Sequence, residues 1–202
     1  HREGDWDPYV FKTEDYGQSW IALHNDLPSG SINVIVEHPD NPDVLFVGTE
    51  NSVFVSVNGG SGWTKLKANL PTTLYDDMVI HPREKDLILG THGRSFWVLD
   101  DTTPFAEWSK SQNKNLFLFS IRPATLFYYW KDTSYRGQEE WVGPNPPYGA
   151  LINFVINSDA DSAKITISRK KKTIREYKIA VNKGKIDQIV WDLKYPPPSF
   201  QN

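Results

Sequence analysis

The sequence of 202 residues contains no cysteine, which excludes disulfide bridges, zinc–thiolate sites and a cysteine nucleophile. It has no apolar run close to the roughly 20 residues that a membrane-spanning helix needs, so we expect no such span. A surplus of positive charge is also missing, because 22 Lys and Arg stand against 25 Asp and Glu. Without a global positive field, we expect no dedicated nucleic-acid binder.

The composition is that of a folded chain. Apolar residues make up 39% and aromatic residues 13%, with eight Trp, and this excludes general disorder. The length allows one or two domains with a real core. Because the first residue is His rather than Met, we expect a processed chain or a section of a longer one.

A pattern in the first hundred residues returns after 43 positions. The stretch 10–20 reads VFKTEDYGQSW, and the stretch 53–63 reads VFVSVNGGSGW. A Leu-Pro pair at 27 and a His-Pro pair at 38 also return, at 70 and 81. A repeat period of 20 to 50 residues is typical of solenoids and propellers.

Each repeat predicts four short strands, because β-branched and apolar runs alternate with Gly, Pro, Asn and Asp clusters. In the complete unit these strands are Ile32 to Glu37, Val44 to Gly48, Val53 to Val57, and a fourth that begins at Trp63. A unit of this length fits a propeller blade. The fold class is therefore all-β, with a partial β-propeller of about two four-stranded blades plus part of a third.

The turn before each fourth strand has the pattern Ser/Thr-x-Asp/Asn-x-Gly-x-x-Trp. The Asp or Asn can accept backbone N–H bonds, the Gly can take a positive φ, and the Trp can fill the space between neighbouring strands. We interpret these residues as structural: Asp15, Gly17, Trp20, Asn58, Gly60 and Trp63.

This turn resembles the Asp-box of the BNR repeat in sialidases, xyloglucanases and sortilin-type propellers. The stretches 91–101 (THGRSFWVLDD), 143–150 (GPNPPYGA) and 190–196 (VWDLKYP) resemble bacterial propeller proteins of the sortilin-like, BNR-repeat "glycosyl hydrolase" group. The resemblance implies export to the periplasm, the cell surface or the medium. It also implies an immunoglobulin-like or fibronectin-like domain after the propeller.

Three segments are predicted along the chain. Residues 1–101 are terminal propeller blades, 102–149 a linker with short strands, and 150–202 the start of an immunoglobulin-like β-sandwich. The last segment carries four alternating runs at regular spacing, which is typical of a sandwich: 151–156, 164–168, 174–179 and 188–193. The linker holds the aromatic run 127–130, which could pack between domains or stack on a sugar ring.

The ligand mouth of a propeller is usually formed by the loops that enter each blade and by those that join its second and third strands. In this chain the loops 72–77, 50–52 and 91–94 supply the candidate binding residues Glu50, Asp76, Asp77, His92 and Arg94. A pair such as Glu50 with Asp77 has the chemistry of a glycosidase. The alternative is that acidic residues are simply common in such loops, and that Arg94 forms a salt bridge that locks the final unit.

The basic run Arg169 to Lys172 stands at a predicted hairpin tip, as a solvated turn or an anion site, and we favour the solvated turn. Two functions remain open. The first is a non-catalytic binding module with a peptide, protein or glycan ligand at the mouth. The second is a glycan-active hydrolase whose carboxylates lie mainly outside this segment. We expect no cofactor and no metal. Because two blades cannot close a ring, the expected partners are further blades of the same protein or of another chain.

Overall fold

The computed structural model describes residues 4–126 and 145–196, and it divides into two compact units, residues 1–110 and 111–202. The first unit contains β1 (Phe11–Lys12), β2 (Ile21–Ala22), β3 (Ile32–His38), β4 (Asn41–Thr49), β5 (Val53–Ser56), β6 (Thr64–Lys65), β7 (Tyr75–Ile80), β8 (Leu87–Thr91), β9 (Phe96–Leu99) and the one-turn helix α1 (Thr103–Ala106). The helix α2 (Trp108–Ser111) follows. The second unit contains β10 (Leu116–Leu118), β11 (Ala150–Ile156), β12 (Ser162–Arg169), β13 (Lys172–Ala180) and β14 (Ile186–Trp191).

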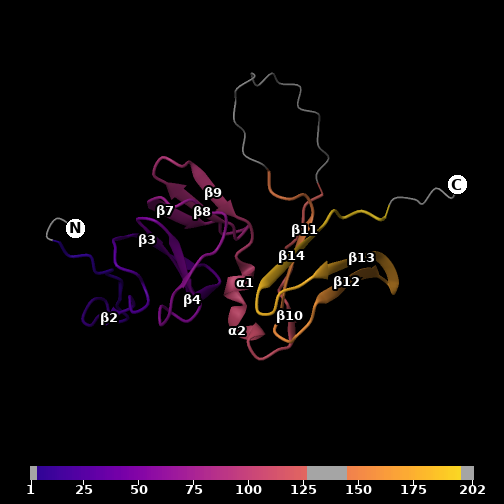
Figure 1. Cartoon of the computed structure of the whole chain (residues 1–202), viewed down its shortest axis with the longest axis horizontal. Helices are drawn as coiled ribbons and strands as arrows, with labels where there is room; N and C mark the ends of the chain where they lie inside the picture. The colour runs from indigo at the N-terminus through magenta and orange to yellow at the C-terminus, as the bar shows by residue number, and fades with distance from the viewer. Residues whose placement is uncertain (1–3, 127–144, 197–202) are drawn as a thin grey trace, which may run out of the picture. The chain divides into compact units, whose positions relative to one another are not determined.

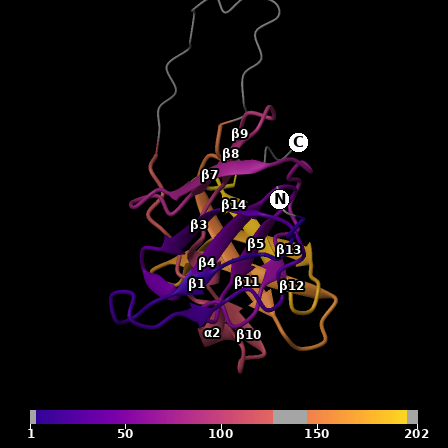
Figure 2. The ribbon, with the colours of Figure 1, turned by 90° about the vertical axis from the view of Figure 1, so that its left-hand side faces the viewer.

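The described part of the first unit contains three antiparallel sheets, with the orders β1-β2, β3-β4-β5-β6 and β7-β8-β9. Figure 1 shows β7, β8 and β9 of the last sheet beside one another. Figure 2 shows β3, β4 and β5 of the complete sheet beside one another. The sequence predicted this four-stranded unit and its strand order, and both are confirmed. The first sheet supplies the third and fourth strands of one repeat, and the last sheet supplies the first three strands of another.

The middle strands of the complete sheet, β4 and β5, are buried on both faces, because their alternate side chains point to opposite sides and both sides are covered. Val44 and Phe46 of β4 pack in a cluster with residues of β7 and β8. Leu45 and Val47 of the same strand pack in a second cluster with Trp63 and residues near β1 and β2. The three sheets are therefore stacked face to face. This is the arrangement of neighbouring propeller blades, and the predicted partial propeller is confirmed.

A glycine permits the close approach of two of these sheets. A Cβ on Gly48, near the end of β4, would lie 2.8 Å from Val34 Cγ1 and 3.0 Å from Tyr75 Cβ. Such distances are too short for carbon atoms in contact. β3 and β4 can therefore lie against β7 only because this position carries no side chain.

The segment after β9 does not form a fourth strand. Thr102 donates its backbone N–H to the Lys85 carbonyl at 2.8 Å, and α1 begins at the next residue. Phe105 of this helix meets Phe46 edge to face, with ring centroids 5.5 Å apart. The predicted linker 102–149 thus also includes helical turns. Its aromatic run 127–130 lies outside the described residues.

The second unit is a small β-sandwich of the sheets β10-β11-β14 and β12-β13. Phe154 and Ile156 of β11 pack against Ile165 of β12 and Ile179 of β13. The four strands predicted after residue 150 are all present, and each of their ends lies within two residues of the predicted one. β10 adds a fifth strand from the predicted linker by pairing with β11.

Candidate functional site

The candidate residues and the repeated turns (residues 13–20 and 56–63) lie at opposite ends of the sheets. Ile32 pairs with Thr49, and Tyr75 with Thr91, so the starts of β3 and β7 lie beside the turns that follow β4 and β8. Ser56 pairs with Leu45, and the Gly59 N–H donates to the Asp43 carbonyl at 2.8 Å, so the second repeated turn lies beside the first half of β4, toward the other end of the sheet. We call the first of these ends the candidate end.

Asp76 and Asp77 are not in a loop, which corrects the sequence prediction that the loop extends to residue 77. They belong to β7, where Tyr75 pairs with Thr91 and Asp77 pairs with Gly90 across a register shift. Both carboxylates are exposed while Tyr75 is fully buried. The strand therefore accepts two Asp residues because neither has to leave water.

Asp76, near the start of β7, and His92, in the loop after β8, come together. His92 Nδ1 lies 3.4 Å from Asp76 Oδ2, and both side chains are mostly exposed. Two further bonds fix the loops to each other: the His92 N–H donates to the Leu74 carbonyl at 2.9 Å, and the Thr73 hydroxyl donates to the His92 carbonyl at 3.0 Å. The candidate end thus places an acidic group of β7 beside a basic group of the loop after β8.

Glu50 and Asp77, which the sequence offered as a carboxylate pair, each have a partner of their own. Glu50 Oε1 accepts a hydrogen bond from the Ser31 hydroxyl at 2.9 Å. Asp77 Oδ1 accepts one from the backbone N–H of Met78 at 2.8 Å. Arg94 is exposed in the turn after β8, where its carbonyl accepts a bond from the Trp97 indole at 3.0 Å.

The repeated turns share one hydrogen-bond scheme, 43 residues apart. The Gly17 N–H donates to the Thr13 hydroxyl at 2.7 Å, and the Gly60 N–H donates to the Ser56 hydroxyl at 2.9 Å. In the same way, the amides of residues 19 and 62 donate to the side chains of Asp15 and Asn58 at 2.8 and 3.0 Å. The polar groups at the centre of each turn are thus satisfied within the turn.

Two features stabilise the conformation of these turns or restrict the residues that they accept. The hydrogen bonds from Ser19 lower the pKa of Asp15 from 3.8 to about 2, because they favour the charged carboxylate. Gly60 has φ +84°, and a Cβ there would lie 2.9 Å from Leu23 Cδ1, so this position requires glycine.

The two Trp residues of the turns have different surroundings. Trp63 is 8% exposed, and its indole N–H donates to the Leu23 carbonyl at 2.6 Å. Trp20, its counterpart in the first copy, is 61% exposed. The difference arises because the sheet β1-β2 covers Trp63, whereas no described sheet covers Trp20.

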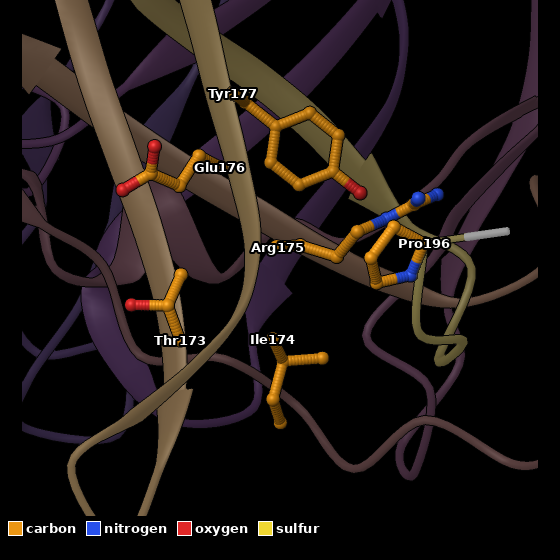
Figure 3. Close-up of a pocket in the computed structure, with 6 residues that line it drawn as sticks. All are labelled: Thr173, Ile174, Arg175, Glu176, Tyr177 and Pro196. Atoms are coloured by element: carbon orange, nitrogen blue, oxygen red, sulfur yellow. The ribbon is translucent and has the colours of Figure 1, made fainter. Parts of the chain in front are cut away.

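Sequence reasoning missed an open hollow in the second unit. Its volume is about 540 Å³, and β13 lines it together with one residue that follows β14 (Figure 3). Arg175 Nη2 lies 3.2 Å from Asp192 Oδ2, so the guanidinium charge is balanced there. The only signal in the sequence was the basic run that precedes these residues. The lining residues are Thr173, Ile174, Arg175, Glu176, Tyr177 and Pro196.

The described residues contain neither a metal-binding cluster nor a membrane-spanning helix. Within residues 4–126 and 145–196, no group of three or more His, Cys, Asp or Glu side chains is arranged to hold a metal ion. No helix in that part of the chain is long and apolar enough to cross a membrane.

Small antiparallel sheets, stacked face to face and carrying the same turn at one end, define a β-propeller type of protein. The model of the Sortilin-Vps10 family, described as sortilin, neurotensin receptor 3, matches residues 9–141. Because this match covers more than half of the chain, the chain belongs to the Sortilin-Vps10 family. No curated protein and no solved structure matches the sequence. The family indicates a propeller-type binding module in an extracellular or lumenal domain.

Proposed function

We propose that the propeller unit is a non-catalytic binding module that holds a polypeptide ligand at the candidate end. The observation that carries this proposal is the contact between His92 and Asp76, which joins the loop after β8 to the start of β7 at one end of the stacked sheets. The opposite end is a poorer ligand surface, because the central polar groups of both repeated turns are satisfied internally.

The charges of the candidate end favour a polypeptide ligand. The carboxylates of Glu50, Asp76 and Asp77 suit ammonium and guanidinium groups, and the guanidinium of Arg94 suits a carboxylate. A polypeptide offers both kinds of group, whereas a neutral glycan offers neither. The family description, which names a neurotensin receptor, supports the same class of ligand.

Binding of the full-length protein to an array of charged peptides tests the proposal. We expect Arg94→Ala and Asp76→Asn each to weaken the binding of the tightest-binding peptides about 3-fold to 30-fold, as the loss of an interface charge does. Arg83→Ala and Asp40→Asn are the matched controls. They remove the same charges from the turns after β7 and β3, at the opposite end, and binding should stay unchanged.

Two results would contradict the proposal. Equal losses in the control variants would show that the candidate end is not the binding surface. Release of sugars from complex glycans by the full-length protein, abolished in Glu50→Gln or Asp77→Asn, would assign the glycan-active hydrolase instead. In that case the protein would belong with the bacterial glycosyl hydrolase group that the sequence resembles.

We further propose that more blades cover the outer faces of the stack, supplied by the same protein or by another chain. Trp20 supports this proposal, because its counterpart Trp63 is buried by a neighbouring sheet. On the last sheet, Val79, Phe96 and Val98 are 52%, 75% and 56% exposed. Apolar sheet faces of this kind normally pack against another layer.

Three finer assignments complete the proposal. The repeated turns are Asp-boxes of the BNR type, which their shared hydrogen-bond scheme supports. The sandwich is the start of an immunoglobulin-like domain, which the packing of β11 against β12 and β13 supports. The protein is exported, as the extracellular or lumenal character of the family supports.

A further inference from the structure

The net charge of −3 conceals two units of opposite sign. Residues 1–110 carry 8 Lys and Arg against 17 Asp and Glu, whereas residues 111–202 carry 14 against 8. Half of the basic residues of the second unit lie in the β12–β13 hairpin, residues 162–180, where seven of them accompany Glu176 as the one acidic residue. A local positive surface thus exists in a chain that is acidic overall.

The outward face of this hairpin carries cations and hydroxyls. The inward side chains pack in the sandwich, and the outward ones are exposed. No exposed side chain of the hairpin is aromatic or a large aliphatic, which disfavours base stacking and insertion into a lipid surface. The exposed residues are Ser162, Lys164, Thr166, Ser168, Arg169, Lys170, Lys171, Lys172, Thr173, Glu176, Lys178 and Ala180.

The cations stand at positions that raise the energy of the unliganded hairpin. Lys170 and Lys171 have φ of 47° and 66°, in a two-residue turn that favours Asn and Gly. Lys164 and Lys178 pair directly across the strands, where like charges repel. Lys164 has an acidic partner in Glu176 at 2.8 Å. For the other exposed cations of the hairpin, the described residues provide no ion pair. The repulsion between the cations falls when an anion neutralises the surface, whereas the backbone cost at Lys170 and Lys171 does not change.

We propose that the β12–β13 hairpin binds an acidic polysaccharide, through its cations and outward hydroxyls. The exposed hydroxyls between the cations favour a saccharide over other polyanions, because a sugar polymer offers hydroxyl groups to them as well as acidic groups to the lysines. The hollow takes no part, because its Arg175 and Tyr177 side chains point toward Pro196, to the other side of β13 from Thr173 and Glu176 (Figure 3). The polymer would run along the exposed lysines.

The experiment measures the dissociation constant of the full-length protein for dextran sulfate and for polygalacturonate, with neutral dextran as the blank. The test variant is Lys170→Asn/Lys171→Gly, which removes two charges and installs the residues that this turn favours, so the hairpin should fold at least as well. The control is Lys183→Ser/Lys185→Ser, which removes two charges from the turn between β13 and β14.

We expect the test variant to bind the acidic polymers at least 5-fold more weakly. The slope of log K against log salt should fall by about two, because one counterion is released per neutralised charge. The control should bind nearly as the parent does. Similar binding of the sulfated and the carboxylated polymer indicates that the hairpin recognises negative charge in general. Binding of only one polymer identifies the acidic group, sulfate or carboxylate, that the hairpin recognises.

Three outcomes would overturn the proposal. One is a test variant that binds like the parent, and another is equal binding of neutral dextran. The third is tighter binding of duplex DNA, anionic vesicles or a second copy of the chain than of either polysaccharide, with the same loss in the test variant. Arg94→Ala separates this proposal from the proposed function, because it should weaken peptide binding and leave polysaccharide binding unchanged.

Discussion

The contact between Trp63 and the neighbouring sheet allows a quantitative test of blade stacking. Trp63→Ala removes a buried indole that fills the space between the sheets β1-β2 and β3-β4-β5-β6. It also leaves the Leu23 carbonyl without its 2.6 Å donor. Trp20→Ala is the matched control, because Trp20 holds the equivalent position 43 residues earlier and is 61% exposed.

The expected cost follows from the area and the hydrogen bond. A buried Trp removes about 150–250 Å² from water, which at about 25 cal/mol per Å² corresponds to about 4–6 kcal/mol. Measured Trp-to-Ala costs in cores are about 3–5 kcal/mol, and we expect Trp63→Ala to lie in this range. Trp63→Phe keeps most of the area and should cost about 2 kcal/mol. Trp20→Ala should cost less than about 1 kcal/mol, as an exposed substitution does.

Urea unfolding of the 202-residue chain and its variants, followed by far-UV circular dichroism, measures these differences. Equal costs for Trp63→Ala and Trp20→Ala would refute the reasoning, because stacking against β1-β2 would then not explain the burial of Trp63. If a further blade, from the same protein or from another chain, covers Trp20, the two costs should become similar in its presence, so the same pair of variants also tests the proposed partner.

Three further predictions concern the propeller unit. Burial lowers the pKa of His38 below 6.5, so the unfolded chain binds the proton more readily. Stability should therefore be lost as pH falls below about 6.5, and a His38→Gln variant should lack this loss in urea midpoints measured between pH 5 and 8. Gly60→Ala should cost about 2–4 kcal/mol through backbone strain and overlap, whereas Gly93→Ala, with φ +74° and open space around it, should cost no more than about 2 kcal/mol in thermal unfolding. The amide shift of Ser19 should titrate with Asp15 near pH 2 in NMR spectra, and a midpoint near 4 would show that the turn does not hold the carboxylate.

Local patterns predicted the strands well because the repeat fixed their limits. Val44 to Gly48 was read as a strand from its apolar run, and a run without alternation is what a sheet buried on both faces requires. The turns were predictable because Gly17 and Gly60 mark left-handed positions. The domain boundaries at 101 and 149 stay predictions.

The site was harder to predict because it depends on contacts between loops. The hydrogen bonds that place His92 beside Leu74 and Thr73 come from backbone geometry that no motif encodes. Asp76 was assigned to a loop because Asp is rare in strands, and an exposed strand position removes that penalty. The hollow on β13 was missed because five consecutive residues line it, which gives no periodic signal.

The first repeated turn keeps its hydrogen bonds even though its Trp is exposed. Closure of such a turn thus does not wait for a neighbouring layer. On the ribosome, each hairpin of this kind could close as soon as some twenty residues had emerged, with stacking left to a later and slower stage. The blades of a nascent chain would then stack after their repeated turns had already formed.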